Sequence, residues 1–400
     1  MTLNPMRPLT QPLTKKAPYR AWAEVDLGAV GANLKALQKL FGHQTKIMAV
    51  VKANGYGLGA VPIARTALEA GASSLAVSSC EEGVTLRQAG LPGQILVMGY
   101  VPPEGAEAAA EAGLTVTVND ATLVQALAQA TRRIRWRNTP LPVQLKLETG
   151  LHRSGLEPPE ALALARLIAA SPGLTLQGLY THFATGDEAD PGFVYEQMRR
   201  FDATRDLLLA QGFRFAQEHL ANSASAINLP SSRRRIVRVG LSLLGYYPSE
   251  QSRLDGLQLE PCLTLKSRVA RLSGLEPGEG VGYNLTFKAE APKELALVPV
   301  GYADGYRRNL SNKGEVLIGG KRARVLGRVM MDQFVVDVTD HPPLAERDEV
   351  VLIGRQGTAE VTLEEVATTC DTITWEVLTG LGSRIRRVYT NAGALLYEEE

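Results

Sequence analysis

Lys52 stands at the end of an apolar segment and is followed by a glycine-rich stretch. The segment Ile47–Val51 reads as a buried strand, and Gly55, Gly57 and Gly59 come soon after the lysine. An amine at the mouth of a dry pocket loses hydration, its pKa falls, and it becomes a Schiff-base nucleophile toward a carbonyl compound such as pyridoxal phosphate (PLP). Glycines let the backbone approach a ligand closely. The plainer alternative is a solvated lysine at a strand end.

Short apolar strands alternate with helical patterns through the first part of the chain, and this alternation predicts a (β/α)8 TIM-type barrel. The helical patterns fill the gaps between the strands. We expect strands near Ile47–Val51, Ser74–Val77, Gln94–Val97, Thr115–Val118, Val143–Leu147, Leu176–Tyr180, Glu218–Ala221 and Ile236–Val239.

From about residue 256 the pattern changes to period-two segments separated by glycine-bearing turns, with one helix near Leu363–Cys370. Such alternation is typical of antiparallel sheets. We therefore predict three parts: a loose tail at residues 1–19, the barrel at residues 20–255, and a mostly antiparallel β domain at residues 256–400.

Polar residues follow the expected strands at their carboxyl ends, where barrels place their active sites. The last two strands often bind phosphate through backbone N–H groups and a hydroxyl, and Ser223 with the amides of Gly240 and Leu241 suits that task. Turn and cap chemistry alone would explain Asn222 and Ser223 equally well. The polar residues at the strand ends are Lys52, Glu148, Arg153, His182, Asn222, Ser223, Arg238 and Gly240.

The fifth expected strand carries Gln144, Lys146 and Glu148 at alternate positions, so these side chains share one face. If the apolar face meets the helices, the polar face points into the barrel. A bare ammonium there is costly. Either Glu148 neutralises Lys146 in a short ion pair, or a modification does, in which case Arg153 could pair with the new negative charge.

Composition excludes several classes of protein. The 43 lysines and arginines nearly balance the 42 aspartates and glutamates, so no nucleic acid or anionic membrane is implied as a partner. Three widely separated cysteines do not make a disulfide framework or a metal site and favour a reducing cytoplasm. No signal-peptide core or membrane-spanning stretch is evident. We expect a cytoplasmic enzyme without a metal.

From about Arg20 to about Tyr389 the chain resembles the alanine racemases. The resemblance rests on ordered motifs spread over both expected domains, and any one of them alone would be weak. The motifs are Val51-Lys52-Ala53-Asn54-Gly55-Tyr56, Lys146 to Arg153, Tyr180-Thr181-His182-Phe183-Ala184, Ala221-Asn222-Ser223-Ala224, Val237-Arg238-Val239-Gly240, Val281-Gly282-Tyr283-Asn284, Gly301 to Tyr306 and Met330-Met331-Asp332-Gln333.

The resemblance implies a PLP-dependent isomerase that interconverts L-alanine and D-alanine and supplies D-alanine for peptidoglycan. Lys52 would carry the cofactor and serve as the base on one face of the substrate's α-carbon, and Tyr283 would serve on the other face. Two bases are needed because a single base returns its proton to the same face. A tyrosine acts as a base near neutrality only with a cation-linked hydrogen-bond network, which His182 and Arg238 would provide.

The resemblance also implies how the cofactor and substrate are held. Arg238 would donate to the PLP ring nitrogen and keep it unprotonated. Arg153 would meet the cofactor's phenolic oxygen and the substrate carboxylate, and Lys146 corresponds to a lysine that becomes carbamylated. The backbone of Met331 would help bind the carboxylate. The remaining cofactor-binding positions are Tyr56, Asn222, Ser223, Gly240, Leu241 and Trp375. In the family the tyrosine comes from the partner subunit, which implies a head-to-tail homodimer.

Three residues depart from the family pattern. Leu58 replaces a histidine, and Glu148 replaces an aspartate. Trp375 stands where the family has a tyrosine beside the phosphate and the substrate methyl, and an indole donates only through its ring N–H. These departures bear on phosphate binding and on the preference for alanine.

Other functions stay open at this stage. A racemase of broader specificity, for serine or other small amino acids, would use the same residues. A PLP-dependent decarboxylase on a similar plan would want an acidic partner for the ring nitrogen instead of Arg238. A noncatalytic PLP-binding protein would resemble the barrel alone, so the β domain with Tyr283 counts against it. Proton exchange at the α-carbon of L-alanine separates an alanine racemase from the decarboxylase and from the noncatalytic protein.

Overall fold

A computed structural model of the chain describes residues 19–134 and 139–398. The predicted tail therefore falls outside the described residues, except for Tyr19. The chain forms two compact units. One consists of Ala29–Gly55 and Gly59–Pro261, and we call it the barrel unit. The other, the β unit, contains the described residues up to Gly28, Tyr56–Leu58, and the chain from Cys262 onward.

The barrel unit is built on an eight-stranded sheet whose paired strands are all parallel, which confirms the predicted barrel. Strand β9 pairs with β2, and the Arg238 amide donates to the Ala221 carbonyl just beyond β8 at 3.1 Å, so the ring is nearly closed. The strands are β2 (Lys46–Val50), β3 (Ser74–Val77), β4 (Ile95–Val97), β5 (Thr115–Val118), β6 (Leu141–Lys146), β7 (Leu174–Tyr180), β8 (Gln217–His219) and β9 (Ile236–Val239).

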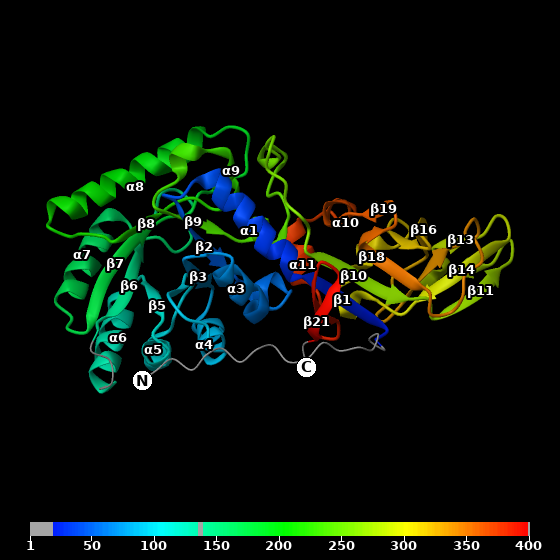
Figure 1. The fold of residues 1–400 in the computed structure, drawn as a ribbon, viewed down its shortest axis with the longest axis horizontal. Coiled ribbons are helices and arrows are strands. Elements are labelled where there is room, and N and C mark those ends of the chain that lie inside the picture. Colours follow the sequence, from blue (N-terminus) through cyan, green and yellow to red (C-terminus); the bar gives the residue numbers. More distant parts are fainter. Residues whose placement is uncertain (1–18, 135–138, 399–400) are drawn as a thin grey trace. The chain divides into compact units, whose positions relative to one another are not determined.

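Helices separate the strands along the chain and lie outside them (Figure 1). Local signals fix where they begin: the Ser79 and Asp120 side chains accept the amides of Glu82 and Leu123, and Pro158 opens a first turn. The helices are α1 (Leu27–Phe41), α3 (Ala60–Glu69), α4 (Cys80–Gln88), α5 (Ala106–Glu111), α6 (Ala121–Arg133), α7 (Pro158–Ala169), α8 (Gly192–Ala210) and α9 (Ser223–Asn228); the short turn α2 (Lys52–Tyr56) is described with the site. No helix among the described residues is long and apolar enough to cross a membrane.

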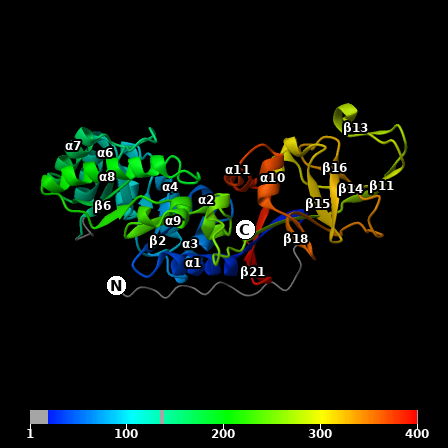
Figure 2. The same cartoon turned by 90° about the horizontal axis from the view of Figure 1, so that it is seen from above.

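The β unit contains an 11-stranded, mostly antiparallel sheet and a two-stranded one, as predicted. Helices α10 (Leu363–Thr369) and α11 (Thr374–Thr379) belong to this unit, and α10 lies near β18 in both views (Figures 1 and 2). The strands are β1 (Ala21–Asp26), β10 (Leu263–Arg268), β11 (Arg271–Leu275), β12 (Gly280–Val281), β13 (Phe287–Lys288), β14 (Lys293–Val298), β15 (Glu315–Ile318), β16 (Lys321–Leu326), β17 (Phe334–Asp337), β18 (Glu349–Gln356), β19 (Ala359–Val361), β20 (Arg386–Asn391) and β21 (Ala394–Glu398).

Two features of the β unit differ from the sequence analysis. The predicted barrel range began at residue 20, whereas β1 pairs with β10 and β20 of the other sheet. An apolar strand followed by a helix looks like a first βα unit, and its true partners lie far along the chain. The segment Leu263–Leu272, expected as one strand, is divided at Val269 and Ala270, where the chain leaves β18 for β14.

Candidate active site

Lys52 opens a left-handed turn directly after β2. Ala53 and Asn54 have φ of 51°, Gly55 has 61° and Tyr56 has 56°. All four residues that follow the lysine therefore hold a left-handed conformation that glycine adopts most readily, and three of them are not glycine. The Asn54 carbonyl accepts the Gly59 amide at 2.8 Å, and its side chain accepts the Ala60 amide at 2.9 Å. These hydrogen bonds hold the strained turn in place, and the turn therefore fixes the position of the Lys52 backbone.

Glu82 connects this turn to the barrel, a role that no motif in the sequence predicts. Its carboxylate accepts the Ala53 amide at 2.6 Å and, through the other oxygen, the Ser78 amide at 2.7 Å. The capping-box pattern Ser79 to Glu82 is visible in the sequence, but the contact with Ala53 joins residues 29 positions apart. Burial, followed by the charge of Arg153, lowers the pKa of Lys52, and Glu82 opposes this.

We expect Glu82→Gln to lower the pKa of Lys52 further, because a negative neighbour is lost while Arg153 remains. The carboxamide nitrogen would also face an amide N–H, which should lower the free energy of unfolding by about 1–3 kcal/mol. Competitive acetylation of the cofactor-free protein over a pH series, with the Lys52 peptide quantified by mass spectrometry, measures the pKa. Glu81→Gln, on the same helix but exposed, is the control, and identical titration of Lys52 in both variants would contradict a role for Glu82.

Lys146 lies inside the barrel, as the alternation in its strand predicted. Its ammonium donates to Ser154 Oγ at 2.8 Å, and burial, then the charges of Arg153 and Arg238, lower its pKa to about 8. The short ion pair with Glu148, one of two expected solutions, is not formed. Glu148 instead accepts the Gly150 amide at 2.5 Å and the Arg153 amide at 3.4 Å, because it falls on the turn after β6.

Arg153 lies at the centre of the charged groups in the barrel mouth. Its positive charge lowers the pKa values of Lys52, Lys146 and His182. The turn that presents it contains Gly150 with φ of 131° and His152 with φ of 52°. The four cations Lys52, Lys146, Arg153 and Arg238 therefore share one region, with Glu82 and Glu148 as the carboxylates that oppose them.

Arg238 is 3% exposed, and no carboxylate among the described residues pairs with it. Nη1 donates to the ring and carbonyl of His219, both at 2.8 Å. Nη2 has three acceptors: the Thr181 carbonyl at 2.8 Å, the Leu220 carbonyl at 2.9 Å and His182 Nδ1 at 3.2 Å. Burial lowers the pKa of Arg238 to about 10. Within the described part of the chain no group accepts from Nε, so this one donor is available.

The guanidinium fixes the tautomers of two histidines. Arginine only donates, so Nδ1 accepts in both His182 and His219, and each ring carries its proton on Nε2. Burial, and then the charge of Arg238, hold both pKa values well below the ordinary range, so both rings are neutral near pH 7. His182 consequently offers an Nε2–H donor.

His219 extends the hydrogen-bond network from Arg238 into the barrel, and it is not among the predicted site residues. Its Nε2–H donates to Gln144 Oε1 at 2.8 Å, and Gln144 Nε2 donates to Gln217 Oε1 at 2.8 Å. The His219 ring also stacks on Tyr180, with centroids 4.8 Å apart. The signal was present, since Gln217 and His219 alternate along β8 as Gln144 and Lys146 do along β6. This chain of hydrogen bonds, from Gln217 through Gln144 and His219, holds the Arg238 guanidinium in one orientation.

The ends of the last two strands meet through Ser223 and Gly240. The Gly240 amide donates to Ser223 Oγ at 3.1 Å, which brings the start of α9 beside the turn that begins at Leu241. The Asn222 side chain accepts the Ser225 amide at 3.0 Å, so it caps α9. Cap chemistry, one of the two roles that the sequence allows for Asn222, is therefore present in the structure.

The other predicted site residues lie in the β unit. Tyr283 opens a 3-10 turn in which Asn284 and Leu285 have positive φ, and it is 69% exposed. Met331 is 52% exposed, and its carbonyl accepts the Ala303 amide at 3.0 Å. Trp375 is half-buried in α11. Tyr56 is buried, and burial raises the pKa of its phenol.

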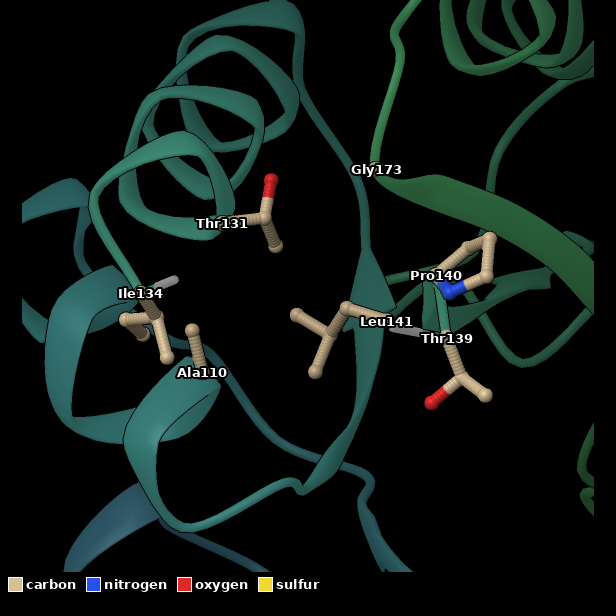
Figure 3. Close-up of a pocket in the computed structure, with 7 residues that line it drawn as sticks. All are labelled: Ala110, Thr131, Ile134, Thr139, Pro140, Leu141 and Gly173. Carbon is tan, nitrogen blue, oxygen red and sulfur yellow. The ribbon is translucent and has the colours of Figure 1, made fainter. Parts of the chain in front are cut away.

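A separate cavity of about 260 Å³ lies at the amino-terminal end of β6 (Figure 3). Ile134, at the end of α6, and Leu141, the first residue of β6, are among its walls. None of the described residues that line it has a titratable side chain, and the cavity lies at the opposite end of the strand from Lys146. These described lining residues are Ala110, Thr131, Ile134, Thr139, Pro140, Leu141 and Gly173.

Fold and site together define a barrel enzyme with a buried amine and a cation-rich mouth. Residues 25–248 match the alanine racemase N-terminal domain, and residues 262–389 match the alanine racemase C-terminal domain. An alanine racemase of Symbiobacterium thermophilum is 45% identical over 369 residues, which cover 92% of this chain and 96% of the relative. The chain is an enzyme that belongs to the alanine racemase family, which confirms the resemblance.

Solved structures give the same result. Alanine racemase from Clostridium difficile superposes with a TM-score of 0.91 and 33% identity, over 96% of this chain and 99% of that one. A histidine racemase from Leuconostoc mesenteroides superposes with a TM-score of 0.84 and 30% identity, over 94% and 99%. The fold is therefore similar to that of racemases with different named substrates.

Proposed function

We propose that this chain interconverts L-alanine and D-alanine with PLP as cofactor, and that the D-alanine supplies peptidoglycan synthesis in the cytoplasm. The observation that carries the proposal is the cation cluster of the barrel mouth. Lys52 and Lys146 both have lowered pKa values beside Arg153, and both lie in the segment that matches the family's N-terminal domain. A phosphorylated, anionic aldehyde suits an amine surrounded by cations.

The donor groups fit PLP at three points. Lys52 offers the amine, and Arg238 Nε offers one donor for the ring nitrogen. The Leu241 amide and the Ser223 hydroxyl, whose oxygen accepts the Gly240 amide, offer a phosphate site. Arg153 would hold the phenolic oxygen, and Asn222, Tyr56 and Trp375 would complete the surroundings. When bound, PLP would withdraw electrons from the substrate's α-carbon and so make its C–H bond acidic.

The protein would supply the proton transfers. Lys52 Nζ, with its lowered pKa, would accept the proton on one face of the α-carbon, and Tyr283 Oη would deliver one on the other face. Neutral His182, whose Nδ1 is held by Arg238, would donate from Nε2 to the Tyr283 oxygen and stabilise it when deprotonated. Met331 and Arg153 would hold the substrate carboxylate.

We further propose that the active form is a homodimer in which Tyr283 completes the partner's site. Several large apolar side chains of the β unit are exposed in the single chain: Tyr283 is 69% exposed, Leu285 and Met331 are each 52% exposed, and Tyr302 is 42% exposed. Exposed apolar groups of this size favour an interface. Burial of these side chains would also desolvate the tyrosine that the mechanism uses.

Incubation of the PLP-loaded protein with L-alanine in deuterated water tests the proposed function. Racemisation should give D-alanine that is deuterated at the α-carbon. Chiral chromatography identifies the enantiomer, and mass spectrometry measures the deuterium. Loss of carbon dioxide would indicate a decarboxylase, and retention of the α-proton with bound PLP would indicate a noncatalytic binding protein. The likeness to the histidine racemase makes a racemase of broader specificity the second candidate, so serine and histidine belong in the same assay.

Lys146 is expected to be carbamylated, because its pKa of about 8 leaves an appreciable fraction of neutral amine near neutral pH. That fraction grows as the pH rises toward the pKa, so carbamylation should increase from pH 6 to pH 8 in bicarbonate. Carbon-13 NMR of protein supplied with labelled bicarbonate would show a carbamate signal that Lys146→Ala lacks. A Lys146→Ala spectrum with the same signal would assign it elsewhere.

Trp375→Tyr is expected to tighten PLP binding by roughly one to two orders of magnitude. A tyrosine hydroxyl on a charged phosphate is worth about 1.5–3 kcal/mol, and each 1.4 kcal/mol is tenfold. No described residue accepts from the Trp375 indole N–H. We also expect the bulkier indole to keep alanine well ahead of serine and to exclude lysine and arginine. We would measure the PLP dissociation constant, and kcat/KM for alanine, serine and lysine, in the variant and in the parent protein. If neither the affinity for PLP nor the order of substrates changes, Trp375 is an ordinary packing residue.

A further inference from the structure

A second cavity, of about 650 Å³, opens at the amino-terminal ends of the barrel strands. Its walls include Lys46 and Ser74, the first residues of β2 and β3, and Gln217 and Ile236, the first residues of β8 and β9. Lys52 follows the other end of β2. The cavity therefore lies at the opposite end of the strands from the candidate active site, and we call it the floor cavity.

The floor cavity has a positive lining. Lys46, Arg234 and Arg235 line it, and no aspartate or glutamate of residues 19–134 or 139–398 does. Arg234 is paired with Asp202 at 2.8 Å, whereas no ion pair joins Lys46 or Arg235 to a carboxylate in the described part of the chain. Two cations without ion-pair partners beside one cavity make the electrostatic potential there positive and attract anions.

Ser74 provides an unpaired hydroxyl in the same cavity. The residue is 2% exposed, and its Oγ has no hydrogen-bond partner among the described residues. Ser74 pairs with Met48, which pairs with Arg238, and residues side by side across parallel strands share a face. The Arg238 guanidinium lies inside the barrel, so the Ser74 side chain also points inward. Buried hydroxyls without partners are uncommon and call for a ligand or water.

The inner wall of the floor cavity is rigid. Gln217 Nε2 donates to Gln94 Oε1 at 2.7 Å, and Gln94 Nε2 donates to Gln177 Oε1 at 2.8 Å. Gln144 closes the layer by donating to Gln217 Oε1 at 2.8 Å. These amides hold one another in fixed orientations, which preorganises a polar surface and reduces the cost of ordering it around a ligand.

We propose that the floor cavity binds a small anion that carries a phosphate or carboxylate group. Arg235 and Lys46 contact the charged group, since guanidinium and ammonium donors both form charge-assisted hydrogen bonds to such oxygens. Ser74 Oγ donates to the same molecule. The lining contains none of the residues to which the proposed racemisation assigns a role. Failure of one proposal therefore does not contradict the other.

Isothermal titration of the full-length, PLP-loaded protein with inorganic phosphate, and separately with succinate, tests this site. At least one of the two should bind with one molecule per chain. The Lys46→Gln/Arg235→Gln double variant should weaken binding at least about tenfold, because charge-assisted bonds are lost. Ser74→Ala should weaken it by about threefold to tenfold, the loss expected for one hydrogen bond.

Arg132→Gln/Arg133→Gln, at the exposed end of α6, removes the same charge away from the cavity and serves as the control. Its binding should equal that of the parent protein. Equal weakening by the control would reduce the effect to general charge and overturn the site. If neither anion binds at concentrations up to about 10 mM, the binding free energy is weaker than about 3 kcal/mol. That result would also overturn the site. A normal binding isotherm in the double variant would have the same meaning.

Discussion

Borohydride reduction of the PLP-loaded protein is expected to leave the pyridoxyl group on Lys52. This amine has its pKa lowered by burial and by Arg153, and the strained turn after it fixes its position at the end of β2. Lys52→Ala should lose the covalent attachment and lower racemisation by at least about 10³-fold, because the same group is the proposed proton acceptor. Peptide mapping after reduction and kcat with L-alanine measure the two effects.

Lys35→Ala, on the exposed face of α1, is the matched control and should leave both measurements unchanged. Peptide mapping that placed the pyridoxyl group on Lys146 would remove Lys52 from the centre of the mechanism. Lys146 is a second candidate for the Schiff base, because its pKa is also lowered, to about 8. The mapping therefore distinguishes two amines of lowered pKa, the half-buried Lys52 and the buried Lys146.

The barrel could be predicted because each of its strands has a local signal in the sequence, a short apolar run between two helical patterns. Strand β9, expected at Ile236–Val239, has those bounds in the structure, and β5 has the bounds expected for Thr115–Val118. Continuous apolar runs between helical patterns admit few other architectures. The alternation of Gln144 and Lys146 also predicted that their side chains point inward, and their hydrogen bonds show that they do.

Contacts between residues far apart in the chain could not be predicted in this way. Strand β1 resembles the first strand of a barrel, yet its hydrogen bonds go to β10 and β20. Nothing in the neighbourhood of Glu82 signals that its carboxylate reaches Ala53. The Lys146–Glu148 pair failed for a related reason: spacing put the two on one face, but the turn after β6 gave Glu148 backbone amides as closer partners.

The network around Arg238 was predicted in part. The family resemblance pointed to Arg238 with His182, and the structure joins them at 3.2 Å. His219 and Gln144 beneath them emerged only from the fold, since residues on β6, β8 and β9 must converge before their roles are visible. The tautomer of His182 follows from that convergence, and it decides which ring nitrogen can serve a catalytic tyrosine.

Tyr283→Phe is expected to retain PLP and to lower racemisation by about 10²–10⁴-fold, the range for removal of a general acid or base. The substitution removes only the phenolic oxygen, so ring packing is preserved. Tyr195→Phe, an exposed tyrosine of α8, is the matched control and should keep the parent rate. The absorbance of bound cofactor, recorded for both variants, shows that any loss of rate is not a loss of PLP.

Deuterium exchange then separates the two faces of the substrate. With Tyr283 removed, Lys52 can still exchange the α-proton of one alanine enantiomer with solvent, whereas the other enantiomer should exchange far more slowly. A variant that failed to fold would exchange neither, and a variant whose remaining base served both faces would exchange both. Selective exchange without racemisation is thus the result that assigns Tyr283 Oη to the second face, and parent-like racemisation in both directions would exclude it.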